Sequence, residues 1–185
     1  PVAKGIGDTM KAGSAAKTGA HDDRDMPMSA IAILSLVCLL AIGALLYLFI
    51  QSAPTLQPFT WPLVFGGVAF TVVVGAFIAT VAGYMAGLIG ASNSPVSGIG
   101  ILSIVIGALL LAAFAQPVLG DGATDALIAF ALFAVAMVFS IATISNDNLQ
   151  DLKTGQLVGA SPWRQQIALI VGVIAGALVI GPVLD

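Results

Sequence analysis

The sequence predicts an all-α integral membrane protein, and two observations lead to that fold class. Hydrophobic residues make up 59% of the chain, charged residues only 8%, and the mean hydropathy is +1.08, whereas soluble domains are about half apolar and about a quarter charged. The 95 residues between Asp25 and Asp121 contain no charged residue and no histidine. Apolar runs of about 20 residues cross a bilayer as helices, because a helix satisfies its own backbone hydrogen bonds. Continuous runs also exclude a β-barrel, whose strands alternate apolar and polar residues.

The apolar runs divide the chain into a polar arm and about five transmembrane helices. The arm, residues 1–27, is small, polar and charged, and its last residue, Pro27, suits the first turn of a helix. Ser94 and Ser161 are each followed by proline, which predicts a helix cap and a first helical residue at both places. The expected spans are about 28–50, 62–89, 94–116, 125–146 and 163–184.

The basic residues predict the orientation of these helices. With five alternating spans, all six fall on one side of the membrane, and the positive-inside rule makes that side cytoplasmic. The arm and the 146–164 loop are therefore expected in the cytoplasm. The six residues are Lys4, Lys11, Lys17, Arg24, Lys153 and Arg164.

Two polar stretches interrupt this apolar chain. The first, Gly83 to Gly98, is uncharged, which is typical either of a helix break inside the membrane, lining a cavity, or of a tight hairpin at the surface. The second follows the fourth span, where a continuing helix would place Asp147 and Asp151 on one face and Gly155 at its C-terminal stop. An amphipathic extension of this kind lies along the membrane or docks on neighbouring helices. A solvated turn, with Asp151 paired to Lys153 or Arg164, is the simpler alternative.

The order of residues in these stretches resembles the oligopeptide transporter family, in its bacterial branch. The matching segments are "RDMP", "GYMAGLIGASNSPVSGIGI" and "NDNLQDLKTGQLVGASPWRQQ". That family includes the yellow-stripe-like metal-chelate transporters, in which an Asp, a Lys-Thr-Gly and a Ser-Pro recur in the same kind of segment. Members are several times longer, with many helices in two related halves, so this chain resembles an interior portion of a larger polytopic bundle.

The resemblance implies proton-coupled secondary uptake, a symport of oligopeptides or metal chelates across the bacterial inner membrane. Its partners would be the bilayer, the remaining helices of the transporter, a small peptide or chelate, and protons. Broken helices often form transporter sites, which makes the first stretch a candidate substrate path and the second a candidate for gating or proton coupling. The path candidates are Tyr84, Ser92, Asn93, Ser94 and Ser97, and the gating candidates are Asn146, Asp147, Asn148, Asp151 and Lys153.

Other functions are disfavoured or remain open. One cysteine and one histidine cannot form a metal-ligand cluster, no phosphate-binding loop occurs, and no basic patch suggests nucleic acid, so we expect no metal, no cofactor and no enzymatic activity. A channel or pore subunit with "SNSPVSG" as a re-entrant loop is the alternative function. A membrane scaffold without transport activity is a second alternative function.

Overall fold

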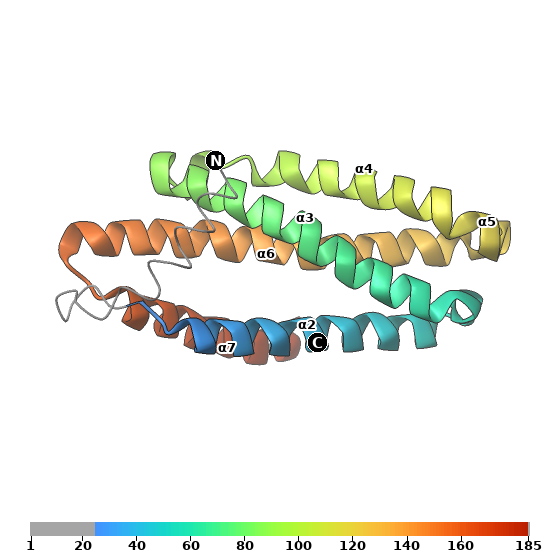
Figure 1. Cartoon of the computed structure of the whole chain (residues 1–185), viewed down its shortest axis with the longest axis horizontal. Helices are drawn as coiled ribbons and strands as arrows, with labels where there is room; N and C mark the ends of the chain where they lie inside the picture. Colours follow the sequence, from blue (N-terminus) through green and yellow to red (C-terminus); the bar gives the residue numbers. More distant parts are fainter. Residues whose placement is uncertain (1–24, 185) are drawn as a thin grey trace. The chain divides into compact units, whose positions relative to one another are not determined.

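The structure is a computed structural model that describes residues 25–184, and the regular elements in that range are all helices. Five of the helical segments are long and apolar enough to cross a membrane (Figure 1), which confirms the expected all-α membrane class and the number of spans within the described residues. The elements are α2 (Met28–Ser52), η1 (Pro54–Phe59), α3 (Thr60–Ile89), η2 (Ala91–Asn93), α4 (Val96–Phe114), α5 (Gln116–Leu119), η3 (Asp121–Ala123), α6 (Thr124–Val158) and α7 (Pro162–Leu184).

The chain forms two compact units. One comprises residues 35–150 and contains most of α2, all of α3 and α4, and α6 up to Gln150. Among the described residues, the other combines residues 25–34 with residues 151–184, and so contains the first turns of α2, the last turns of α6 and the whole of α7. The two units are described separately below.

Within the 35–150 unit, α3 packs along α6 through a row of small residues. Cβ atoms added to Gly67, Gly75 and Gly83 would lie 3.3 Å from the Phe130 ring, 2.9 Å from Ile141 Cδ1 and 2.9 Å from Ser145 Oγ, respectively. The row recurs every four residues, with Thr71 and Ala79 between the glycines. Small residues let membrane helices approach closely, because apolar side chains gain little from leaving lipid. The residue numbers of these contacts increase in the same direction along both helices, so α3 and α6 run in parallel.

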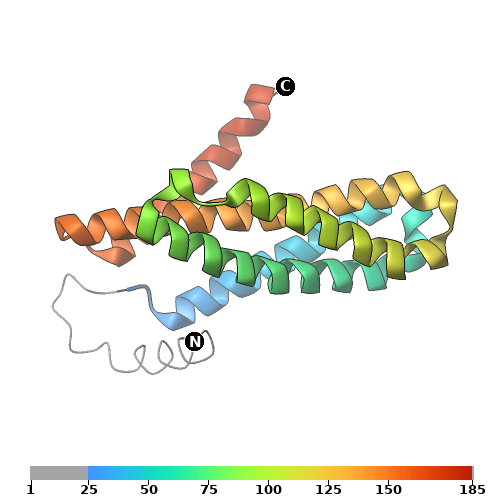
Figure 2. The same cartoon turned by 90° about the horizontal axis from the view of Figure 1, so that it is seen from above.

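Helix α4 returns beside α3 in the opposite direction (Figure 2). A Cβ on Gly100 would lie 2.7 Å from the Phe139 ring of α6, and one on Gly107 would lie 3.6 Å from Val135 Cγ2. The residue numbers of these contacts increase along α4 and decrease along α6, so the two helices are antiparallel. Glycines on two different helices thus receive the larger side chains of α6, which makes α6 the central helix of this unit.

The main core lies at the end of the unit where the short helices η1, α5 and η3 contact one another. Phe49 of α2 stacks on Phe133 of α6, with ring centroids 4.9 Å apart. These stacked rings join α2 to α6. The buried cluster consists of Leu46, Ile50, Leu56, Leu63, Val64, Ala115, Ala123, Leu127, Phe130 and Ala134.

Large apolar side chains also cover the outer faces of the helices. Leu40 of α2, Phe77 of α3 and Ile101 of α4 are each about two-thirds exposed, and α7 has no buried residue. Apolar surface of this extent marks contact with a membrane or with other protein. The exposed faces therefore agree with an integral membrane protein.

Two expected helix ends are placed differently by the structure. Helix α4 begins at Val96, and Pro95 is its N-cap residue, so the expected cap at Ser94 is wrong. The Val96 amide donates to the Ser94 carbonyl at 2.8 Å across Pro95, whose φ of −79° and ψ of 44° are close to those of an inverse γ-turn. This turn directs the chain so that no side-chain cap forms at the helix start.

The other difference is the end of α6, which continues past Gly155 to Val158. The actual stop is Gly159, whose φ of +72° suits glycine. The Ala160 amide donates to the Gly155 carbonyl at 2.9 Å, which is the six-to-one bond of a Schellman motif. Helix α7 then begins at Pro162, as the sequence predicts.

Candidate functional site at the break between α3 and α4

The break between α3 and α4 contacts the polar end of α6 within the 35–150 unit. Gly90, with a φ of +85°, ends α3 and turns the chain into the short helix η2. The Ala91 amide then donates to Gln150 Oε1 at 3.0 Å, and Asn146 Nδ2 donates to the Ala91 carbonyl at 3.5 Å. The two polar stretches of the sequence are therefore brought together, and the backbone of Ala91 lies between two carboxamide side chains.

Two buried polar atoms at this junction have no hydrogen-bond partner among the described residues. They are Asn146 Oδ1, on a side chain that is 5% exposed, and Ser94 Oγ. Both residues contact the same atom, because the Ala91 carbonyl also accepts from the Ser94 amide at 3.1 Å. Buried polar groups in native proteins are nearly always paired. This junction is therefore an unusual place in an apolar bundle.

Other buried polar side chains of the unit are satisfied locally. Thr71 Oγ1 donates to the Gly67 carbonyl at 2.8 Å, and Ser103 Oγ donates to the Ile99 carbonyl at 2.9 Å. Such bonds to the preceding turn let a hydroxyl exist in an apolar helix without a partner on another helix. The unpaired atoms are thus a property of the junction and not of the bundle as a whole.

The remaining path candidates lie on the outside of the break. Ser92, Asn93 and Ser97 are exposed, and Tyr84 is exposed on α3 before the break. Asn93 Nδ2 donates to the Ile89 carbonyl at 3.1 Å, which satisfies one of the last carbonyl groups of α3. The break thus presents hydroxyl and carboxamide groups outward, without a charged residue between Gly90 and Pro95.

The gating candidates divide between buried and exposed positions on α6. Asn146 is buried, Asn148 is half-buried, and Asp147 is exposed. In the other unit, Asp151 and Lys153 are exposed, and Lys153 Nζ donates to Gln156 Oε1 at 3.0 Å. Within residues 25–184 no ion pair joins Asp151 to Lys153 or Arg164, so the expected pairing is wrong. The α6–α7 turn is closed instead by Gly159 and by Gln165, whose Nε2 donates to the Ala160 carbonyl at 3.3 Å.

The sequence reasoning missed two residues of this site. Gln150 holds the Ala91 amide, and Ser145 Oγ donates to the Ala79 carbonyl of α3 at 2.8 Å. Spacing in the sequence could have identified Gln150, because it lies four residues after Asn146 and therefore on the same helix face. Nothing in the sequence indicated that this face packs against the break.

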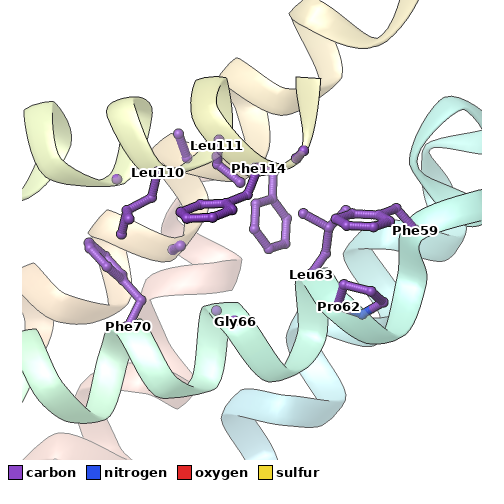
Figure 3. A pocket seen from close by; sticks show the side chains of 14 residues that line it. Phe59, Pro62, Leu63, Gly66, Phe70, Leu110, Leu111 and Phe114 are labelled. Carbon is purple, nitrogen blue, oxygen red and sulfur yellow. The ribbon is translucent and has the colours of Figure 1, made fainter. Parts of the chain in front are cut away.

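A separate apolar cavity of about 400 Å³ lies between α3, α4 and α6. Figure 3 shows Phe70 and Leu63 of α3 directed toward Leu110 and Phe114 of α4. Its lining contains no charged or amide side chain and none of the candidate site residues. A cavity of this chemistry suits apolar groups and offers nothing to a peptide backbone, so it is not the polar site.

The described residues offer no obvious metal centre. No group of three or more His, Cys, Asp or Glu side chains comes together in residues 25–184. The chemistry available at the break is therefore hydrogen bonding by uncharged donors and acceptors.

Comparisons with known proteins agree on one family. The family model described as OPT oligopeptide transporter protein matches residues 2–185. A protein of Haemophilus influenzae (strain ATCC 51907 / DSM 11121 / KW20 / Rd), named as a candidate oligopeptide transporter, is 46% identical over 156 residues. That match covers 83% of this chain and 24% of the relative, so the chain spans about a quarter of the length of the curated relative it matches. No solved structure matches the chain.

Proposed function

Because this chain belongs to the OPT oligopeptide transporter family, we propose that the whole protein of which it forms a part is a secondary active transporter. It takes up small peptides together with protons across the bacterial inner membrane. Metal chelates are the second substrate class. The N-terminal arm and the 146–164 segment, which is the end of α6 and the turn into α7, lie in the cytoplasm, as the positions of the six basic residues indicate.

The observation that carries this proposal is the uncharged polar junction at the break between α3 and α4. Asn146 is buried there beside the backbone of Ala91, Ser92 and Asn93 are exposed on the same short break, and Ser97 is exposed in the first turn of α4. Hydroxyl and carboxamide groups bind the N–H and C=O groups that every peptide has. A site of this kind accepts peptides of many sequences, so the junction belongs to the substrate path.

Coupling to protons requires a group that changes its charge. Asp147, exposed one residue after Asn146, and Asp151, one turn further along α6, are the carboxylates near the junction. A carboxylate at the membrane edge can relay protons or gate a path. We assign these two residues to coupling and gating, with Asn148 and Lys153 as their polar neighbours on the helix.

Uptake into proteoliposomes tests this function. The full-length protein is reconstituted, a labelled tripeptide is added outside, and an inward proton gradient is imposed. We expect the peptide to accumulate above its outside concentration, and a protonophore to abolish that accumulation. A labelled metal chelate tested in parallel establishes the substrate class.

Two outcomes contradict the proposal. Equilibration of the peptide without concentration, at a rate indifferent to the gradient, would indicate a channel. Absence of any flux of peptide or chelate would indicate a scaffold. For the coupling residues, Asp147→Asn is compared with Asp125→Asn, a matched change in the first turn of α6, and only the former is expected to lower the protons moved per peptide.

A further inference from the structure

We propose that Asn146 and Gln150 form a pair that binds peptide backbone, and that the break between α3 and α4 occupies this pair until a substrate peptide replaces it. The inference rests on the proposed function, because it assigns the backbone of the substrate as the ligand. It adds that Ala91 acts as an internal substitute for one residue of that substrate.

The contacts of Ala91 carry the first step. Its N–H is held by Gln150 Oε1 at 3.0 Å, and its C=O is held by Asn146 Nδ2 at 3.5 Å. One residue therefore offers both of its backbone groups to two carboxamides one helical turn apart. An extended peptide residue offers the same donor and acceptor to a neighbouring strand. The pair consequently recognises groups that do not depend on the side chains of the peptide.

The unsatisfied atoms carry the second step. Asn146 Oδ1 is buried and unpaired within the described residues, although its Nδ2 is used, so the carboxamide makes one of the four hydrogen bonds that its two N–H donors and two lone pairs allow. The bond it does make is long, because 3.5 Å exceeds the usual N–H···O range. Ser94 Oγ beside it is also unpaired. The internal contact is therefore weaker than one that a free peptide backbone could form.

The geometry of the break carries the third step. Gly90 has a φ of +85° and no atom within 4 Å of its Cβ position, so no neighbouring side chain packs against the start of the break. The segment between Gly90 and Val96 is joined to α6 by the two hydrogen bonds described above, and to the end of α3 by the bond from Asn93 to the Ile89 carbonyl. Release of the first two bonds detaches the segment from α6, and a peptide that makes both of them compensates for their loss.

Backbone methylation of the substrate tests the pair. Uptake of labelled trialanine by the full-length transporter is measured in competition with trialanine and with its analogue methylated on the central nitrogen, which lacks that N–H donor. We expect the methylated peptide to compete about tenfold less well against the unaltered protein, the size of one net hydrogen bond. In Gln150→Ala, which removes the oxygen that accepts this N–H, the difference should shrink to about twofold. Asn146→Ala removes only the donor to the carbonyl, so it should weaken both peptides and leave the difference between them intact.

Two further variants serve as controls. Gln150→Glu keeps an acceptor oxygen and should retain the full penalty for methylation. Gln57→Ala removes a carboxamide that also donates to a backbone carbonyl, that of Gln51 at 3.2 Å, but Gln57 lies in η1 and the change should leave the penalty intact. Because Gln150 is exposed on a helix, its alanine variant is expected to fold even where Asn146→Ala does not.

Separation of the break from α6 is measured by the rate at which a maleimide labels a cysteine that replaces Ser94 in a Cys38→Ala background. The buried position of Ser94 Oγ predicts slow reaction with a maleimide, and trialanine should accelerate the reaction several-fold, more than its methylated analogue does. An unchanged methylation penalty in Gln150→Ala, or labelling that trialanine slows or leaves unchanged, overturns the inference while the proposed function stands. If the unaltered protein takes up no peptide, the proposed function fails, and this inference fails with it.

Discussion

Ser145 Oγ of α6 donates a 2.8 Å hydrogen bond to the backbone carbonyl of Ala79 of α3. A Cβ added to Gly83, one turn further along α3, would lie 2.9 Å from the same oxygen atom. The absence of a side chain at Gly83 and the hydroxyl of Ser145 therefore act together to set the register of α3 on α6. That register places Ala91, two residues beyond the end of α3, within reach of Asn146 and Gln150.

The first prediction concerns Gly83. Gly83→Ala should lower the free energy of unfolding by about 1 kcal/mol, because overpacking costs about 1–3 kcal/mol and the better helix propensity of alanine recovers up to about 1 kcal/mol. The matched control is Gly87→Ala, one turn along the same helix, where no described atom lies within 4 Å of the Cβ position. Thermal unfolding of the purified full-length protein in detergent measures both, and an equal effect of the two changes would contradict this packing.

The second prediction concerns the turn between α6 and α7. A Cβ on Gly155 would overlap the side-chain amide of Gln165, the end of a flexible side chain that can turn away. Gly155→Ala should therefore cost the hydrogen bond from Gln165 to the Ala160 carbonyl, about 0.5–1.5 kcal/mol. Gly176→Ala in α7, where the Cβ position has no described neighbour within 4 Å, should not. Gln165→Ala should cost a similar amount, and Gly155→Ala should add little to it in the double variant, since the overlapping group is already gone. A double variant that shows the sum of the two separate losses in the same thermal assay would show that the overlap is not the cause.

The third prediction concerns orientation in the membrane. Single cysteines replacing Gln57 and Lys153, in a Cys38→Ala background, should react with an impermeant reagent from opposite sides. Gln57 lies in η1, and Lys153 lies in the last turns of α6, which is 35 residues long. At 1.5 Å per residue, α6 measures about 52 Å and exceeds the hydrocarbon core of about 30 Å, so its polar end projects into water. Reaction of both cysteines from one side would exclude the five-span orientation.

The fourth prediction concerns the outside of the break. Asn93→Ala and Ser97→Ala should each raise the apparent substrate constant about two- to tenfold, the range expected for the loss of one hydrogen bond. Ser140→Ala is the control, because Ser140 is exposed on α6 and its hydroxyl donates to the Ala136 carbonyl of its own helix at 2.9 Å. Concentration dependence of uptake provides the measurement. Unchanged constants in both variants would place the break outside the substrate path.

The sequence by itself determined the helices of this protein and the family to which it belongs. Long uncharged apolar runs have one solution in lipid, because each backbone group must find its partner inside the segment. The family follows from residue order in the polar stretches, and the comparison confirms it. The sequence predicts the turns at the helix ends less well. Ser94 does not cap α4, and Gly155 does not end α6.

Tertiary structure alone decided which polar residues meet. Asn146 and Ser94 are 52 residues apart in the chain, and no periodicity connects them. They converge on Ala91 because small residues every four positions let α3 lie close along α6. The alternative that pairs Asp151 with Lys153 or Arg164 rested on proximity in sequence, and among the described residues Lys153 donates to Gln156. Sequence spacing describes one helix at a time, whereas the site depends on the register between two helices.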